Sequence, residues 1–92
     1  MTAWQIQNDE ETEIREAIRG IRLPSGVRFN RVVLANDWDG DPSWEIYFDL
    51  PKRLKPTEKF LDSLQEVREK VRGAVFYVAT DKFPYIHFKQ AA

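Results

Sequence analysis

The chain has 92 residues, of which 42% are hydrophobic, and this predicts one small globular domain over residues 1–92 rather than a disordered segment. Lys and Arg (14) nearly balance Asp and Glu (15), which argues against a dedicated duplex-DNA binder, because phosphate contacts need an excess of basic residues. The absence of cysteine excludes disulfides and thiolate metal sites. No signal-peptide pattern and no apolar run of about 18 residues is present, so we expect a cytoplasmic protein with no membrane contact.

The first expected element is a helix over residues 9–22. Asn8 is its predicted N-cap, and Glu11 is the partner of Asn8 in a capping box. Residues 4–7 alternate between apolar and polar, and two interpretations stay open for them: a short leading strand or an irregular lead-in. The helix has one apolar stripe, whose members are spaced by three and four: Ile14, Ala17, Ile18 and Ile21.

A β-hairpin is expected next, with strands over residues 28–37 and 43–50. The second strand alternates clearly between apolar and polar residues, so one of its faces should be buried. Between the strands, residues 38–42 carry a strong turn signal around Gly40.

A second helix is expected over residues 57–72, with Gly73 just after its end. Two more strands then follow, over residues 74–80 and 85–89. The order αββαββ predicts an α+β fold with a single antiparallel sheet and two helices on one face. A leading strand would turn this into a variant of the ferredoxin-like βαββαβ order with one extra strand.

Three aspartates at a spacing of two, Asp37, Asp39 and Asp41, suggest an oxygen site for a hard cation. The match to an EF-hand loop fails, because Pro42 stands at the glycine position and Phe48 at the glutamate position. The favoured interpretation is a turn in which the aspartates accept bonds from backbone amides and Gly40 supplies a positive φ. We therefore expect no cofactor, and a metal-dependent activity stays a minor hypothesis.

His87 is the only histidine, and no serine has a nucleophile motif around it. No phosphate-binding glycine motif is present either. We therefore assign no catalytic residue and expect a protein that is not an enzyme.

Candidate binding residues come from two patterns. If the strands alternate as expected, three tyrosines and the histidine share the sheet face away from the helices, and Trp38 lies near the hairpin tip. This face suits a protein partner, a second copy of the chain or single-stranded nucleic acid, although tyrosines are also common on strands in general. Three arginines share one helix face, as a salt-bridged surface or a site for an acidic partner. The candidates are Trp38, Tyr47, Tyr77, Tyr85, His87, Arg15, Arg19 and Arg22.

Two segments carry a family resemblance: the Asp-Trp-Asp-Gly-Asp-Pro-Ser hairpin at residues 37–43 and the Phe-Pro-Tyr-Ile-His-Phe ending at residues 83–88. They resemble small uncharacterised bacterial proteins that look like partners encoded beside another gene, as in toxin–antitoxin or defence modules. The resemblance implies a non-catalytic partner protein and supplies no functional residues. The leading hypothesis is thus a protein-interaction module that binds and regulates a partner and is antitoxin-like. The alternative is a single-stranded nucleic-acid-binding protein that uses the tyrosine face.

Overall fold

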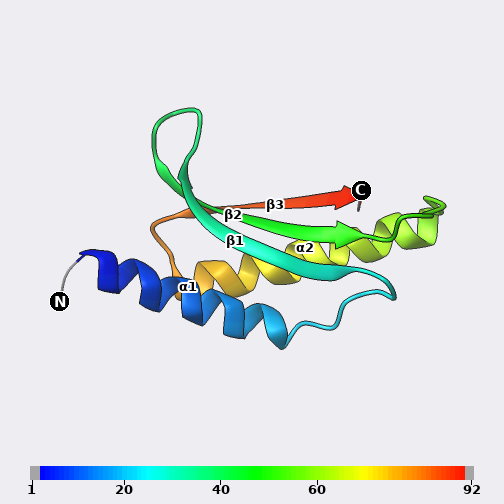
Figure 1. Ribbon diagram of the computed structural model, residues 1–92, viewed down its shortest axis with the longest axis horizontal. Coiled ribbons are helices and arrows are strands. Elements are labelled where there is room, and N and C mark those ends of the chain that lie inside the picture. The colour runs from blue at the N-terminus through cyan, green and yellow to red at the C-terminus, as the bar shows by residue number, and fades with distance from the viewer. Residues whose placement is uncertain (1–2, 91–92) are drawn as a thin grey trace.

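The structure is a computed structural model that describes the backbone of residues 3–90 and the side chains of residues 9–90. These residues form two helices and one three-stranded sheet, and both helices cover the same face of the sheet (Figure 1). The predicted class, an α+β domain with one sheet, is confirmed. The elements in chain order are α1 (Ala3–Arg19), β1 (Arg28–Asn36), β2 (Pro42–Leu50), α2 (Glu58–Val78) and β3 (Phe83–Gln90).

The sheet has the order β1-β2-β3, so β2 is central and both other strands are edges. β1 and β2 form the predicted antiparallel hairpin, with Val32 opposite Ile46. β2 and β3 are parallel, with Ile46 opposite Ile86. The prediction of a wholly antiparallel sheet is therefore wrong, and the sheet is mixed.

The core lies between the sheet and the helices. The central strand contributes alternate residues that are almost fully buried, as its pattern predicts. The helices contribute stripes at spacings of three and four. The largest buried side chains and their main neighbours are Ile14, Ile18, Val32, Trp44, Ile46, Phe48, Leu64, Val67, Val71, Val75 and Ile86.

The helix α1 begins earlier than predicted. Ala3 to Arg19 are helical without interruption, so Asn8 lies inside the helix and is not its N-cap. The hypothesis of a leading strand is wrong for residues 3–7, and with it the ferredoxin-like variant. The physical reason is that no Pro or Gly interrupts residues 3–19 and four alternating residues are too few to decide against a helix. Glu11 lies within 3.9 Å of Arg15 instead of capping the helix.

The helix α2 ends later than predicted, because residues 74–78 continue it instead of forming a strand. Val75 lies four residues after Val71, and both are fully buried. The apolar stripe of the helix therefore continues beyond Gly73. The observed order is therefore αββαβ and not αββαββ. Without that strand, the long helical crossover brings the chain back to the end of the sheet where β2 starts, and β3 runs parallel to β2.

The glycine inside α2 provides a test of this correction. An added Cβ at Gly73 would meet no atom within 4 Å, so Gly73→Ala changes only the cost of fixing a glycine in a helix. We expect it to raise the free energy of unfolding by about 0.8–1 kcal/mol, measured by chemical denaturation. The matched control is Gly40→Ala, also with no atom within 4 Å but with a φ of 87°, and it should destabilise the protein. Destabilisation by Gly73→Ala would show that Gly73 ends the helix.

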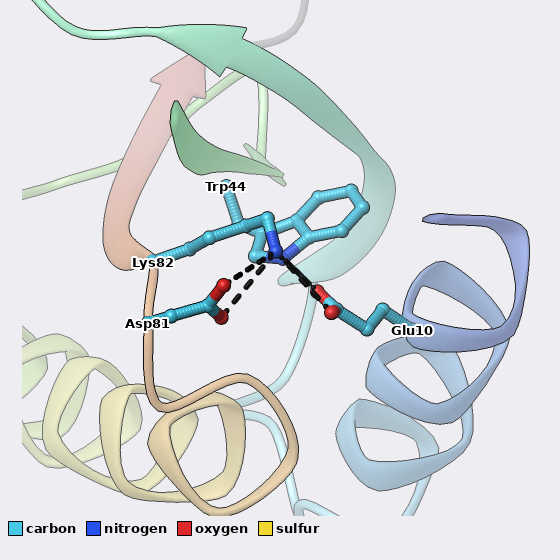
Figure 2. A network of polar contacts seen from close by, with 4 residues as sticks. All are labelled: Glu10, Trp44, Asp81 and Lys82. Atoms are coloured by element: carbon cyan, nitrogen blue, oxygen red, sulfur yellow. Dashed lines mark hydrogen bonds and ion pairs between the residues drawn. The ribbon is translucent and has the colours of Figure 1, made fainter. Parts of the chain in front are cut away.

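A polar network joins the beginning of β3 to α1 beneath the sheet (Figure 2). Lys82 Nζ lies 3.0 Å from Glu10 Oε1 and 3.2 Å from Asp81 Oδ2. The indole N–H of Trp44 donates to the same Glu10 oxygen at 3.2 Å. We call Glu10, Trp44, Asp81 and Lys82 the Glu10 network. These contacts connect α1, β2 and the turn before β3, which are far apart in the sequence.

Neither described helix combines the length and the apolar character that a membrane span needs, within residues 3–90.

Candidate protein-interaction face

One face of the sheet is not covered by the helices (Figure 1). Its residues alternate along each strand with the buried ones, and the strand register places them in rows. One row contains Val33, Glu45 and Tyr85. The next contains Arg31, Tyr47 and His87. We call the following residues the open face: Arg31, Val33, Glu45, Tyr47, Tyr85, His87 and Lys89.

Tyr47 lies at the centre of the open face and is surrounded by aromatic and cationic groups. The His87 ring stacks on it, with centroids 4.8 Å apart and an angle of 21° between the planes. The Arg31 guanidinium lies 4.7 Å and the Lys89 ammonium 4.9 Å from the Tyr47 ring centroid. Both distances suit a cation–π interaction. The surroundings of Tyr47 are therefore aromatic and cationic, and Asp49 adds one carboxylate opposite Lys89.

His87 also contacts the neighbouring row. Its Nε2 lies 3.0 Å from Glu45 Oε1, so the imidazole bridges the basic half of the open face to an acidic one. The other carboxylate oxygen, Glu45 Oε2, is buried and has no hydrogen-bond partner among the described residues.

The acidic hairpin tip is a self-contained turn. Asp37 Oδ1 accepts bonds from the backbone amides of Asp39 and Asp41, each at 3.0 Å. Gly40 has a φ of 87°, which an L-residue rarely adopts. The favoured turn interpretation of this motif is confirmed. Among the side chains of residues 9–90, no cluster of three His, Cys, Asp or Glu is arranged to hold a metal ion.

The hairpin tip rises away from the helices, on the side of the open face (Figure 1). Tyr85 joins the two, since its hydroxyl donates to Asp37 Oδ2 at 3.4 Å. Burial and the nearby Asp37 carboxylate, followed by Glu45 and Asp39, raise the pKa of Tyr85 above its ordinary value. Between tip and sheet lies an open hollow of ≈ 270 Å³, lined by Asn36, Asp37, Trp38, Glu45 and Tyr85.

Four of the predicted aromatic candidates are thus close together. Tyr47, Tyr85 and His87 lie on the open face, and Trp38 lies beside it at the hairpin tip with 91% of its surface exposed. Tyr77 does not belong to this group. It lies on α2, because residues 74–78 are helical, and it is 91% exposed there.

The three arginines do not form the predicted shared helix face. Arg15 and Arg19 lie on α1 and pair with Glu11 and Glu16, at 3.9 Å and 3.8 Å. Arg22 follows the end of that helix, so its position is not set by the helical period. The salt-bridged interpretation holds for the first two arginines, and neither contributes to the open face.

Sequence reasoning missed the charged members of the open face. Arg31, Glu45 and Lys89 were not among the candidates, although Glu45 and Lys89 alternate with buried residues of the same strands. Strand alternation was therefore a sufficient signal for these two. Arg31 was harder to place, because a register shift between Phe29 and Arg31 interrupts the simple alternation of β1.

The comparisons with known proteins assign no family. No protein-family model matches the sequence, and no curated protein matches it significantly.

Proposed function

We propose that this chain is a non-catalytic protein-interaction module that binds a partner protein with its open face and Trp38, and regulates that partner by binding. The observation that carries the proposal is the uncovered sheet face itself. It combines Tyr47, Arg31 and Tyr85 with a tryptophan that is 91% exposed. Trp, Tyr and Arg are the residues that contribute most often to binding energy at protein interfaces.

The size of the open face indicates what kind of complex to expect. Three strands of eight or nine residues cover roughly 14 Å by 27 Å, or about 400 Å². A standard interface buries about 800 Å² per partner. The hairpin tip enlarges this area, and the exposure of Trp38 supports its participation in the interface.

The proposed partner is the product of an adjacent gene, in an antitoxin-like arrangement. This step rests on the resemblance of the hairpin motif at residues 37–43 and the ending at residues 83–88 to small bacterial partner proteins. In the structure these two segments meet, because Tyr85 bonds to Asp37 and both line the hollow beside Trp38. Trp38, Tyr85 and His87 thus belong both to the segments that carry the resemblance and to the proposed interface.

Binding of single-stranded nucleic acid is the second candidate, and one observation favours it. The stacked rings of Tyr47 and His87 lie beside Arg31 and Lys89, and bases stack on such aromatic platforms while cations contact phosphates. The acidic half of the face, with Glu45 and the hairpin aspartates, would repel a strand that continued along it. This limits the platform to about one row, and we place protein binding first.

The test is affinity capture of the tagged protein from its native host, with half of the sample treated with nuclease. We expect one stoichiometric protein that survives nuclease and is lost with Trp38→Ala and with Tyr47→Ala. Tyr77→Ala is the matched control, because it removes an equally exposed aromatic from the helix layer, and it should retain the partner.

Other outcomes of the capture decide against the proposal. Recovery of nucleic acid, with proteins lost after nuclease, would favour the second candidate. If Trp38→Ala and Tyr47→Ala both still capture the partner, the interface lies elsewhere on the chain. If only the chain itself is recovered, and light scattering gives twice the monomer mass, the open face joins two copies of this chain.

A further inference from the structure

The hollow beside the hairpin tip has two aromatic walls. Trp38 and Tyr85 both line it, and the Trp38 indole is almost fully exposed, which leaves its ring face open. Tryptophan is enriched at interfaces, where a partner buries the indole ring. The face of a tryptophan ring attracts cations more strongly than the face of any other side chain.

The remaining walls of the hollow are acidic or polar. Asp37 and Glu45 contribute carboxylates, and Asn36 contributes an amide. Asp39 and Asp41 belong to the same turn and add negative charge nearby. Burial, then Asp37, Glu45 and Asp39 raise the pKa of Tyr85, the second aromatic wall of the hollow.

Glu45 places a negative charge in the wall of the hollow. One carboxylate oxygen bonds His87, and the other is buried without a partner among the described residues. The second oxygen is closed to solvent, so a cation in the hollow would contact the rest of this carboxylate, whose side chain is 23% exposed.

The nearest cations of the open face are engaged elsewhere. Arg31 and Lys89 lie over the Tyr47 ring, and Lys82 is bound to Glu10 and Asp81 below the sheet. A cation for the hollow must therefore come from outside these groups.

We propose that the hollow between Trp38 and Tyr85 binds the guanidinium or ammonium group of a basic side chain that the partner protein presents. This proposal rests on the protein-binding function proposed above and names the chemistry of the partner. The cation stacks on the Trp38 indole, and its N–H groups face Glu45 and Asp37. Arginine fits best, because a planar guanidinium stacks on an aromatic ring and bonds carboxylates at the same time. The acidic walls exclude a phosphate group, so nucleic acid does not compete for the hollow.

The experiment is an NMR titration of the isolated protein with N-acetyl-arginine amide, followed on the tryptophan indole N–H signals. The chain has three tryptophans, and the Trp38 signal is the one that Trp38→Ala removes. The matched ligand control is N-acetyl-citrulline amide, which has nearly the same shape and no charge. The matched protein control for Glu45→Gln is Asp62→Asn, which neutralises an exposed carboxylate on α2.

We expect a saturable shift of the Trp38 signal with the arginine probe and none with citrulline. Glu45→Gln should weaken binding at least about threefold, and Asp62→Asn should leave it unchanged. Added salt should weaken binding as well, because the contact is between opposite charges. Equal shifts with the two probes, or no shift with arginine, would overturn the proposal.

The titration and the capture experiment fail independently. If a partner is captured but the Trp38 signal does not shift in the titration, the proposed basic side chain is refuted and the protein-binding function is still supported. Arginine binding with no captured partner would confirm the chemistry of the hollow and count against the function on which it rests.

Discussion

Trp44→Ala is expected to lower the free energy of unfolding by about 3–5 kcal/mol. Trp44 is 1% exposed, lies on the central strand and packs in the layer between sheet and helices. Its truncation leaves a large cavity that the surrounding strands and helices cannot close. A domain of this length has a total stability of about 5–14 kcal/mol, so a large part of it would be lost. Urea denaturation followed by circular dichroism measures the change.

Two further variants separate the contributions of Trp44. Trp44→Phe keeps most of the apolar volume and removes the N–H that donates to Glu10, so it should cost clearly less than the alanine variant. Trp38→Ala removes the same side chain at 91% exposure and should change stability by less than about 0.5 kcal/mol. A loss at Trp38 as large as at Trp44 would contradict the burial of these two residues.

The hairpin was predictable because each of its signals is local. The burial of β2 alternates from Trp44 to Asp49, and the turn carries Gly40 at the position that needs a positive φ. The register of the pair then follows from the turn and the buried face. The predicted limits of 28–37 and 43–50 accordingly differ from the observed strands by only one residue.

The C-terminal half was harder to predict, because the segment that ends at Ala79 fits both the helical and the strand period of apolar residues. Val75 and Ala79 are four residues apart and continue the helical stripe, while Val75, Tyr77 and Ala79 also alternate as in a strand. Gly73 favoured the wrong choice, since glycine commonly follows a helix end. The deciding contacts are tertiary: Val71, Val75 and Ala79 are all buried. This one error added a strand over residues 74–80, gave β3 the wrong direction and placed Tyr77 on the sheet instead of on α2.

That error left part of the candidate site unaffected. Tyr47, Tyr85 and His87 lie on strands whose alternation was predicted correctly, so they share the open face whichever way β3 runs. Their closeness depends on register, however, and the parallel pairing places His87 opposite Tyr47. The hollow beside Trp38 depends on how the hairpin tip bends over the sheet, and no local pattern in the sequence encodes that.

Lys82→Met is expected to lower the free energy of unfolding by about 2–3 kcal/mol at neutral pH. The side chains of Lys82 and Glu10 are only 12% and 19% exposed, and their charged groups are 3.0 Å apart. Removing the ammonium leaves the Glu10 carboxylate in a poorly solvated place with only the Trp44 N–H as a donor in the Glu10 network. Lys70→Met, on an exposed part of α2, is the control and should cost little.

The pH dependence distinguishes a lost charge from lost packing. Burial by itself lowers the pKa of Lys82, but hydrogen bonds and charges from Glu10 and Asp81 outweigh it and raise the pKa above its ordinary value of 10.5. A raised pKa in the folded state means that the stabilisation is fully present below the ordinary value and is lost as the pH rises through the folded-state pKa. The difference between wild type and Lys82→Met should therefore stay constant from neutral pH to about pH 10 and shrink at higher pH. A double-mutant cycle with Glu10→Gln should give a coupling free energy that disappears over the same range. If the difference persists well above pH 11, Lys82 stabilises the fold through its aliphatic chain, and the Glu10 network is not the electrostatic link between α1 and the start of β3.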